Sequence, residues 1–317
     1  MSKVFTLAQR EDPSRVGDGT KFVPRVQQML DGFRKDDPPI VKKLPVTSDL
    51  PERMCDWGFE KKATEKEKAV GDLGALAFYG LLRIGEYTVK SYRNETKQTK
   101  QFCMKDCTFW TRVHGSFKRL PRRASDKAIM AAEGLTLRLG NQKNGWKGVC
   151  IFHEANGDPR FCFVKVGARR YCHIQREGSL DDYLSSYWTN GIKKDVSDRD
   201  MRHAIKTAGV ELDYPGEYGI DISRLDTHSM RSGGANQLAQ AGYSEMEIQK
   251  MGRWRGDTFK EYIREELACF SEGMSKDMRH KFKFVNIAGG AKGDLHDVTK
   301  PTLDKTYNVN KSAAAAA

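Results

Sequence analysis

The chain has 317 residues, which is enough for about two domains and at least one sizeable hydrophobic core. Its 38% hydrophobic and 10% aromatic residues argue against a fibrous or wholly disordered protein. Lys and Arg number 54 against 42 Asp and Glu, and this surplus of +12 favours a polyanionic partner.

The same sequence disfavours membrane, secreted and zinc-binding proteins. No stretch approaches the roughly 20 apolar residues of a membrane span, and the first residues lack the apolar core of a signal peptide. Seven scattered cysteines favour reduced thiols. Cys103, Cys107 and His114 invite a metal site, but no second Cys or His pair follows at zinc-module spacing. We therefore predict an intracellular protein, nuclear if the host is eukaryotic, without a membrane or metal partner.

The N-terminal 44 residues are polar apart from one short amphipathic stretch. Apolar residues recur at helical spacing over 23–33, and the breaker Asp-Asp-Pro-Pro follows at 36–39. This pattern predicts one helix and a linker.

Two helices are predicted next. Thr47 or Ser48 can cap the first of them. Thr64 and Glu67 have the spacing of a capping box that opens the second, over 64–82. Because apolar residues occur all around this second helix, we expect it to be broadly buried.

Residues 87–167 have a different sequence pattern, with short runs typical of β-strands separated by Gly, Asn and Asp. The predicted strands are 102–110, 134–139, 149–152 and 160–166. They suggest a small antiparallel sheet.

Helical patterns return after residue 171. The predicted helices are 178–188, 197–208, 228–241, 244–251 and 257–268. Gly209 and Gly242 are plausible helix stops, and the tail from Gly289 is polar and Gly-rich. The order of elements predicts a mainly helical α+β protein.

The segment Asp-Thr-His-Ser-Met-Arg at 226–231 places two cationic side chains at a helix start. His228 and Arg231 are three residues apart, about 60° around a helix axis, so both point the same way. The N-H groups and positive dipole end of a first turn also attract anions. This arrangement suits phosphate chemistry, although on spacing alone a solvated helix start is the commoner explanation.

A second segment, 251–262, places Trp254 after a Gly-Arg turn and Tyr262 in the helix that follows. The combination of H-x-x-R, Gly-Arg-Trp and Tyr resembles box II of the tyrosine recombinase (phage integrase) family. The resemblance is to the eukaryotic Crypton and DIRS-like branch, in which Trp replaces the second His of bacterial integrases.

The resemblance extends upstream. Phe-Tyr-Gly-Leu-Leu-Arg-Ile-Gly-Glu at 78–86 looks like box I, with Arg83 as its arginine. The predicted hairpin 135–145 resembles the family's catalytic-lysine hairpin, with Lys143 at its turn and Lys147 as the alternative. All six catalytic positions therefore have a candidate in the family's order, and the implied fold is the tyrosine-recombinase catalytic domain.

The resemblance implies a nucleophile and an anion clamp. A phenol with a pKa of about 10 attacks poorly at neutral pH, yet attack by Tyr262 on a phosphodiester yields a phosphotyrosine that stores the bond for religation. Arg83 and Arg231 can bind the two non-bridging oxygens and neutralise the charge of the transition state.

Three further side chains have implied roles. His228 can assist proton removal, and Lys143 can protonate the departing 5′ oxygen. Trp254 has a single N-H donor, so we expect it to pack the Tyr262 helix and donate to a phosphate oxygen. Neither a carboxylate cluster for Mg²⁺ nor a Walker-type Gly loop is apparent, so no metal, ATP or other cofactor is predicted.

Basic segments outside the candidate site fit contact with the phosphate backbone of double-stranded DNA. They are Lys42-Lys43, Lys118-Arg119, Arg122-Arg123, Arg169-Arg170, and Lys276, Arg279, Lys281 and Lys283. Each segment alone is more often a solvated face, but the net charge favours DNA.

The resemblance also has a departure. Family members carry a helical core-binding domain before the catalytic domain, whereas 1–44 offers one helix that looks like the last helix of a reduced core-binding domain. We expect 45–288 to be the catalytic domain and 289–317 a flexible tail. A fragment, a reduced arm, or a clamp completed by a partner would each explain the short N-terminal part.

The function predicted from these residues is site-specific recombination or integration through a 3′-phosphotyrosyl intermediate, in a synaptic homo-oligomer such as a tetramer. A type IB topoisomerase uses similar residues, but the Trp254 pattern argues against it. A domesticated DNA-binding protein that has lost strand transfer is the alternative from another class.

Overall fold

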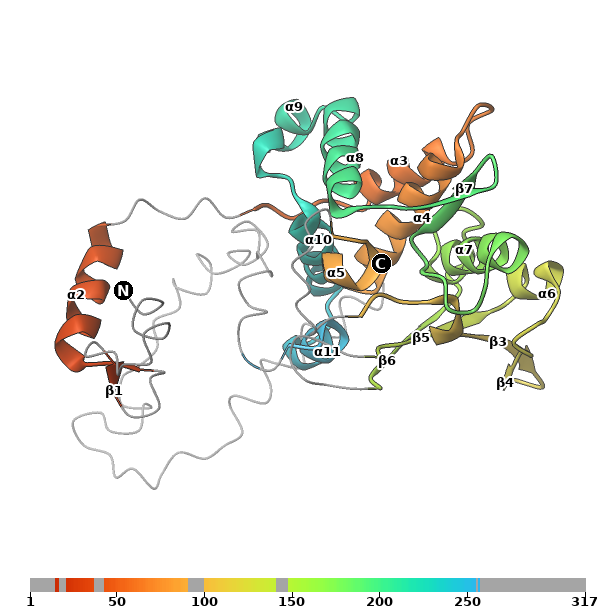
Figure 1. Ribbon diagram of the computed structural model, residues 1–317, viewed down its shortest axis with the longest axis horizontal. Coiled ribbons are helices and arrows are strands. Elements are labelled where there is room, and N and C mark those ends of the chain that lie inside the picture. Colours follow the sequence, from red (N-terminus) through yellow and green to blue (C-terminus); the bar gives the residue numbers. More distant parts are fainter. Residues whose placement is uncertain are drawn as a thin grey trace, which may run out of the picture. The chain divides into compact units, whose positions relative to one another are not determined.

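A computed structural model describes residues 15–16, 21–36, 43–90, 100–140, 148–254 and 256 (Figure 1). All of them belong to Met1–Ile263, the first of two units into which the chain divides. The described helices are α2 (Pro24–Asp36), α3 (Asp49–Trp57), α4 (Glu65–Tyr79), α5 (Ile84–Tyr87), α6 (Asp126–Met130), α7 (Phe163–Glu177), α8 (Asp198–Glu211), α9 (Tyr214–Tyr218), α10 (Thr227–Gln240) and α11 (Glu245–Gly252), with 3-10 turns η1 (Met104–Asp106) and η2 (Ile222–Arg224). The strands are β1 (Arg15–Val16), β2 (Lys21–Phe22), β3 (Cys107–Val113), β4 (Ser116–Arg119), β5 (Gly134–Arg138), β6 (Cys150–Glu154), β7 (Ser186–Thr189) and β8 (Ile192–Asp195). This composition confirms a mainly helical α+β fold with a small antiparallel sheet.

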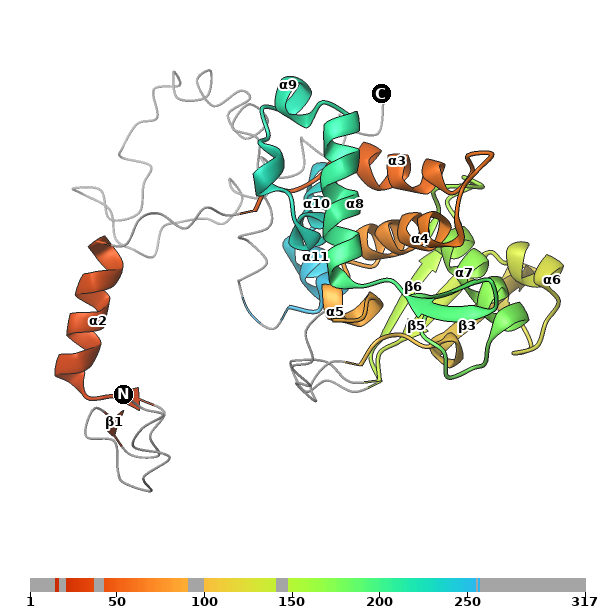
Figure 2. The same cartoon turned by 45° about the horizontal axis from the view of Figure 1, so that its top comes forward.

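Helix α4 lies among α3, α7 and α10, which all pack against it (Figures 1 and 2). The predicted capping box is present, since Thr64 Oγ1 accepts from Glu67 N at 3.2 Å and Glu67 accepts from Thr64 N at 2.8 Å. Every residue over 69–78 is buried. Burial on all sides fixes the end of α4, and with it the turn that leads to Arg83.

The main sheet has the antiparallel order β4-β3-β5-β6. One face packs on α7, where the Phe109 and Tyr171 rings meet edge to face at 5.1 Å. Buried and half-buried side chains alternate over the first four residues of β3, as expected for a sheet with one face on the core.

The prediction of a helix over 178–188 is wrong. Helix α7 ends at Gly178, and the following residues lead into the hairpin β7–β8. Asn190 and Gly191 form the two-residue turn with φ of 50° and 76°. Asn-Gly between two strands is a strong hairpin signal, and here it overrides the weak helical spacing of the preceding residues.

Two other sequence predictions are corrected by packing. Residues 160–166 are not a strand, because α7 begins at Phe163, and a short apolar run cannot distinguish a strand from a fully buried helix start. Gly209 does not end α8, which continues to Glu211. A Cβ at Gly209 would lie 2.6 Å from Leu225 Cδ1, so this glycine serves close packing rather than termination.

The other elements agree with their predicted positions. Strand β3 begins at Cys107, later than predicted, because η1 occupies the preceding residues. Ser48 is the N-cap of α3 but makes no side-chain cap bond. The helix predicted over 257–268 lies outside the described residues. No helix in the described part of the chain is long and apolar enough to cross a membrane.

Candidate active site

Four of the six candidate catalytic residues are described. Arg83, Arg231 and Trp254 lie together where the end of α4, the first turns of α10 and the end of α11 meet. His228 is exposed in the first turn of α10, one turn before Arg231. Lys143 and Tyr262 lie outside the described residues, as do Lys147 and Lys42.

The turn after α4 is the centre of the site. Leu81 has a φ of +46°, a conformation that a bulky side chain rarely adopts. Its carbonyl oxygen accepts from Arg231 Nη1 at 2.6 Å and from Arg253 Nη2 at 3.1 Å. Its side chain is buried beside Trp254. Two guanidinium donors and this packing hold the strained turn, which directs the chain into Arg83.

Arg83 is tied to a buried carboxylate. It forms the N-cap of α5, where its backbone N donates to Glu86 Oε2 at 2.9 Å and its Nη1 donates to Glu86 Oε1 at 3.1 Å. The Glu86 side chain is fully buried, whereas the Arg83 side chain is 22% exposed. Glu86 therefore orients a guanidinium that solvent still reaches.

Arg253 is a second partner of Glu86. Its Nη2 donates to Glu86 Oε2 at 2.9 Å, and its Nη1 donates to Gly80 O at 3.1 Å. The Arg253 side chain is 1% exposed. Burial lowers its pKa from the usual arginine value, and the charge of Glu86 opposes that shift. The ion pair joins the two motifs that the sequence presents 167 residues apart.

Arg231 is held between the same two segments. It donates to Leu81 O and to Gly252 O, and its Cζ lies 4.2 Å from the centre of the Trp254 ring. It is 2% exposed. Gly252 is required here, because a Cβ at this position would overlap the Trp254 ring. Cation-π contact and two carbonyls fix the plane of this guanidinium.

The start of α10 differs from the sequence prediction. The helix begins after Asp226, whose carboxylate accepts from Thr227 N at 2.6 Å and from Arg202 Nε at 3.1 Å. Burial opposes ionisation of Asp226, but these hydrogen bonds lower its pKa overall. The backbone anion site expected at this helix start is therefore occupied by the chain's own carboxylate, and His228 projects from a turn that is already capped.

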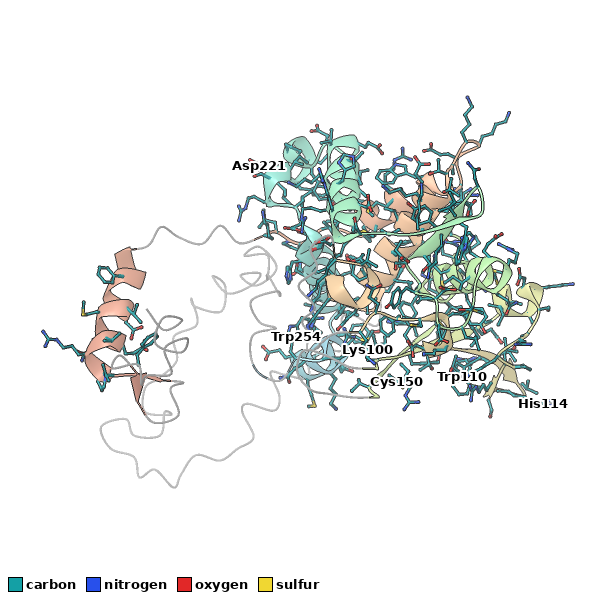
Figure 3. The ribbon with its side chains drawn as sticks, in the orientation of Figure 1. Lys100, Trp110, His114, Cys150, Asp221 and Trp254 are labelled. Atoms are coloured by element: carbon teal, nitrogen blue, oxygen red, sulfur yellow. The ribbon has the colours of Figure 1, made fainter. Side chains whose placement is uncertain are left out.

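The predicted lysine hairpin is present as β5–β6. Leu139 N donates to Val149 O at 2.8 Å, and Gly148 N donates to Leu139 O at 2.8 Å, so the ladder continues beyond the strands. Cys150, near the turn end of this hairpin, and Trp254 lie along the same lower side of the molecule in Figure 3.

Five of the predicted DNA-binding residues are exposed in the described part of the chain. Lys118, Arg119, Arg122 and Arg123 are exposed on β4 and in the turn after it. The Tyr171 hydroxyl donates to Arg122 O, which ties this turn to α7. Lys43 is exposed as well, and its Nζ donates to Ser223 O at 2.8 Å.

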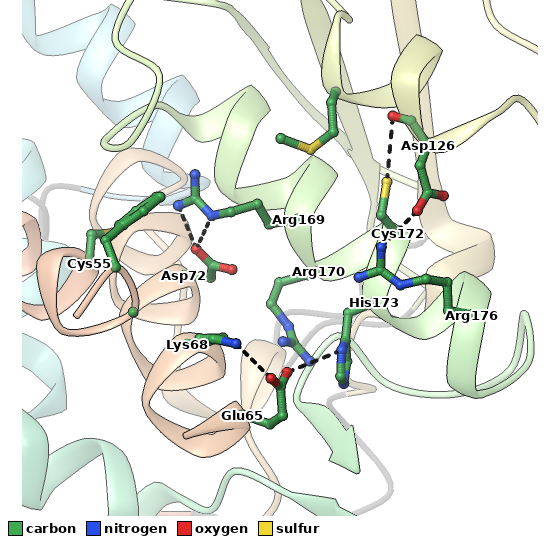
Figure 4. A pocket seen from close by; sticks show the side chains of 13 residues that line it. Cys55, Glu65, Lys68, Asp72, Asp126, Arg169, Arg170, Cys172, His173 and Arg176 are labelled. Carbon is green, nitrogen blue, oxygen red and sulfur yellow. Dashed lines mark hydrogen bonds and ion pairs between the residues drawn. The ribbon is translucent and has the colours of Figure 1, made fainter. Parts of the chain in front are cut away.

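Arg169 and Arg170, also predicted as phosphate contacts, make hydrogen bonds inside the fold. Arg170 is buried and donates to Leu184 O at 3.0 Å and to Ser186 O. Arg169 donates twice to Asp72 Oδ1, at 2.8 and 2.6 Å. Both line a pocket of about 420 Å³ beside α4 and α7 (Figure 4). Arg170 joins α7 to the β7–β8 hairpin, and Arg169 joins α7 to α4.

Sequence reasoning missed the pairing of Glu86 with Arg253. Both residues stand inside the motif segments, but their contact depends on the folding of α11 against α4. The available signal was an acid in an otherwise apolar stretch, which needs a cationic partner when it is buried. In the described part of the site, Arg83 and Arg253 both donate to Glu86, and Arg231 donates to the nearby Leu81 carbonyl.

No family model and no curated protein sequence matches this chain. Similar solved structures include XerA recombinase, at 13% identity and a TM-score of 0.40, covering 78% of this chain and 67% of that one. The Tn1549 transposon integrase in complex with transposon right end DNA has 12% identity and a TM-score of 0.38, covering 77% and 68%. The same integrase with circular intermediate DNA has 13% identity and a TM-score of 0.38, covering 87% and 76%. With TM-scores this low, the function must be argued from the chain's own residues.

We expect Arg253→Met to lower the free energy of unfolding by about 3 kcal/mol, because it leaves the buried Glu86 with one cationic partner instead of two. Arg253→Lys should recover part of the loss, since it keeps the charge but cannot reach three acceptors together. Urea denaturation of the full chain measures both variants. Unchanged stability of Arg253→Met would contradict the role of this ion pair in joining the two motifs.

Proposed function

We propose that this protein is a site-specific DNA recombinase or integrase of the tyrosine recombinase family, in its Crypton and DIRS-like branch. It cleaves and rejoins duplex DNA through a 3′-phosphotyrosyl intermediate without metal or ATP. The observation that carries the proposal is the meeting of Arg231 and Trp254 at the Leu81 turn, which leads directly to Arg83. These residues come from separate sequence motifs, and all of them suit chemistry at a phosphodiester.

The proposed cleavage step transfers a phosphoryl group from one oxygen to another. The Tyr262 oxygen attacks phosphorus, the bond to the 5′ oxygen breaks, and the tyrosine proton leaves with help from His228. Arg83 and Arg231 bind the non-bridging oxygens. Lys143 gives a proton to the departing 5′ oxygen. Religation is the reverse reaction, with a 5′ hydroxyl as nucleophile.

The contacts of Arg231 support this mechanism. Leu81 O and Gly252 O accept from its two terminal nitrogens, and Trp254 covers a face of the guanidinium. A group fixed in this way loses little rotational freedom when the transition state forms. Glu86 holds Arg83 in the same manner, so both candidate clamp residues are oriented before any phosphate binds.

Duplex DNA is the proposed partner. Lys118, Arg119, Arg122 and Arg123 supply exposed cations, and phosphate contacts of this kind give affinity without reading sequence. Strand exchange between two duplexes needs several active sites at once, so we propose a synaptic homo-oligomer on DNA, in the nucleus if the host is eukaryotic.

A suicide duplex with a nick near the scissile phosphate tests the proposal. The short released strand diffuses away, so a cleaving enzyme accumulates as a covalent adduct that survives SDS. We expect this adduct with EDTA present. Nicked duplexes with a randomised core supply the unknown target site, and absence of an adduct on the members that the protein selects by specific binding would indicate a DNA-binding protein. Supercoil relaxation without exchange between two sites would indicate a topoisomerase.

The role of Lys143 predicts a specific rescue. Lys143→Ala should cleave a normal phosphodiester slowly, by about 100-fold or more, because the 5′ oxygen then leaves without a proton. A substrate with sulfur at the 5′ bridging position should restore most of the rate, since a thiolate leaves unprotonated. Gel assays of single-turnover cleavage measure both. Rescue of Lys147→Ala in place of Lys143→Ala would move the general acid to Lys147.

A further inference from the structure

The main sheet has a second face that α7 does not cover. Along β3 to β6, alternate side chains point away from the buried face that carries Phe109, Leu135 and Ile151. Trp110 lies at the lower border of the molecule in Figure 3. We call this surface the outer sheet face, and its large residues are Trp110, Arg112, Phe117, Arg119, Arg138 and Phe152.

Aromatic rings occupy the middle of the outer sheet face. The Phe117 and Phe152 rings meet edge to face with their centres 5.3 Å apart. They cross over Gly134, where a Cβ would lie 3.0 Å from Phe152 and 3.2 Å from Phe117. Trp110 Nε1 donates to Thr136 Oγ1 at 2.8 Å, which fixes the indole. Phe152 is nevertheless 42% exposed, so the cluster presents a ring to solvent.

The charge around these rings is positive. Arg112 pairs with Glu154 at 2.6 Å, and these two charges offset each other. Arg119 and Arg138 are exposed cations on the same face. An apolar protein partner would have to desolvate these cations, whereas a polyanion would bind them.

Among polyanions, unpaired nucleotides fit this surface better than a duplex. A duplex buries its base faces in the stack and presents phosphates, so exposed aromatic rings would gain little from it. Single strands offer base faces that stack on aromatic side chains and phosphates that bind cations.

We propose that the outer sheet face binds single-stranded nucleic acid. Bases stack on Phe152 and Trp110, and the backbone phosphates contact Arg119 and Arg138. This binding needs no cleavage, and it goes beyond the proposed recombinase chemistry.

Anisotropy of labelled oligo(dT) of about 12 nucleotides, compared with a duplex of equal length, tests the proposal in the full chain. Phe152→Ala should weaken oligo(dT) binding by about fivefold or more and duplex binding by less than about twofold, because only the single strand stacks. Phe59→Ala is the matched control, since Phe59 is 47% exposed between α3 and α4, outside the sheet.

Salt dependence separates stacking from charge. Phe152→Ala should leave the slope of log affinity against log salt unchanged, whereas Arg119→Gln should reduce it by about 0.7 for one lost phosphate contact. Equal losses on oligo(dT) and duplex, or unchanged oligo(dT) affinity in both Phe152→Ala and Trp110→Ala, would overturn the proposal. If oligo(dT) affinity is unchanged in both variants, the outer sheet face would be a protein contact, and the variants would show a shift in oligomeric state. Oligo(dT) carries no cleavage site, so these results do not depend on the recombinase activity.

Discussion

Tyr262→Phe is expected to abolish the covalent protein–DNA adduct while leaving duplex affinity within about threefold. In the proposed mechanism the phenol oxygen forms the bond to phosphorus, and no other atom of the side chain can replace it. The aromatic ring is retained, so its packing contribution persists. Adduct yield on the suicide duplex and anisotropy with the same duplex measure the two effects separately.

Tyr243 and Tyr307 are the rival nucleophiles. Tyr243 is exposed just after α10, and Tyr243→Phe serves as the matched control that should keep full adduct yield. Peptide mapping of the wild-type adduct identifies the modified residue directly. A nucleotide on Tyr243 or Tyr307 would contradict the assignment.

The second large effect concerns the anion clamp. Arg83→Ala and Arg231→Ala should each lower the cleavage rate by at least about 100-fold, with much smaller losses of duplex affinity. Negative charge grows on the phosphate oxygens in the transition state, whereas ground-state affinity is shared among many surface cations. Single-turnover cleavage and equilibrium binding give the two quantities.

Arg83→Ala and Arg231→Ala differ in how far a loss of stability adds to the loss of cleavage. Arg83 is partly exposed, so its removal leaves most packing intact. Arg231 joins Leu81 O to Gly252 O inside the fold, and Arg231→Ala is expected to lose stability as well. Thermal unfolding of both variants separates the contributions. Equal losses of cleavage and affinity in Arg83→Ala would mark Arg83 as an ordinary backbone contact.

Local sequence signals predicted much of the fold. The Thr64 and Glu67 capping box and the helices α8, α10 and α11 follow from patterns within a few residues along the chain, and the apolar residues all around α4 indicated that it is buried. The two errors of element type, at 160–166 and 178–188, arose where an apolar run or an overlooked Asn-Gly turn left the spacing ambiguous. The candidate order of Arg83, His228, Arg231 and Trp254 was also available from the sequence alone.

The organisation of the site was decided by tertiary structure. Arg231 reaches Leu81 across 150 residues of sequence, and Arg253 reaches Glu86 across 167. No local rule specifies such contacts, because they depend on how α10 and α11 pack against the end of α4. The same long-range packing buried Arg170, which sequence reasoning had assigned to DNA. Residue type and spacing therefore determined which side chains were candidates, and packing determined which of them face solvent and which are held inside the fold.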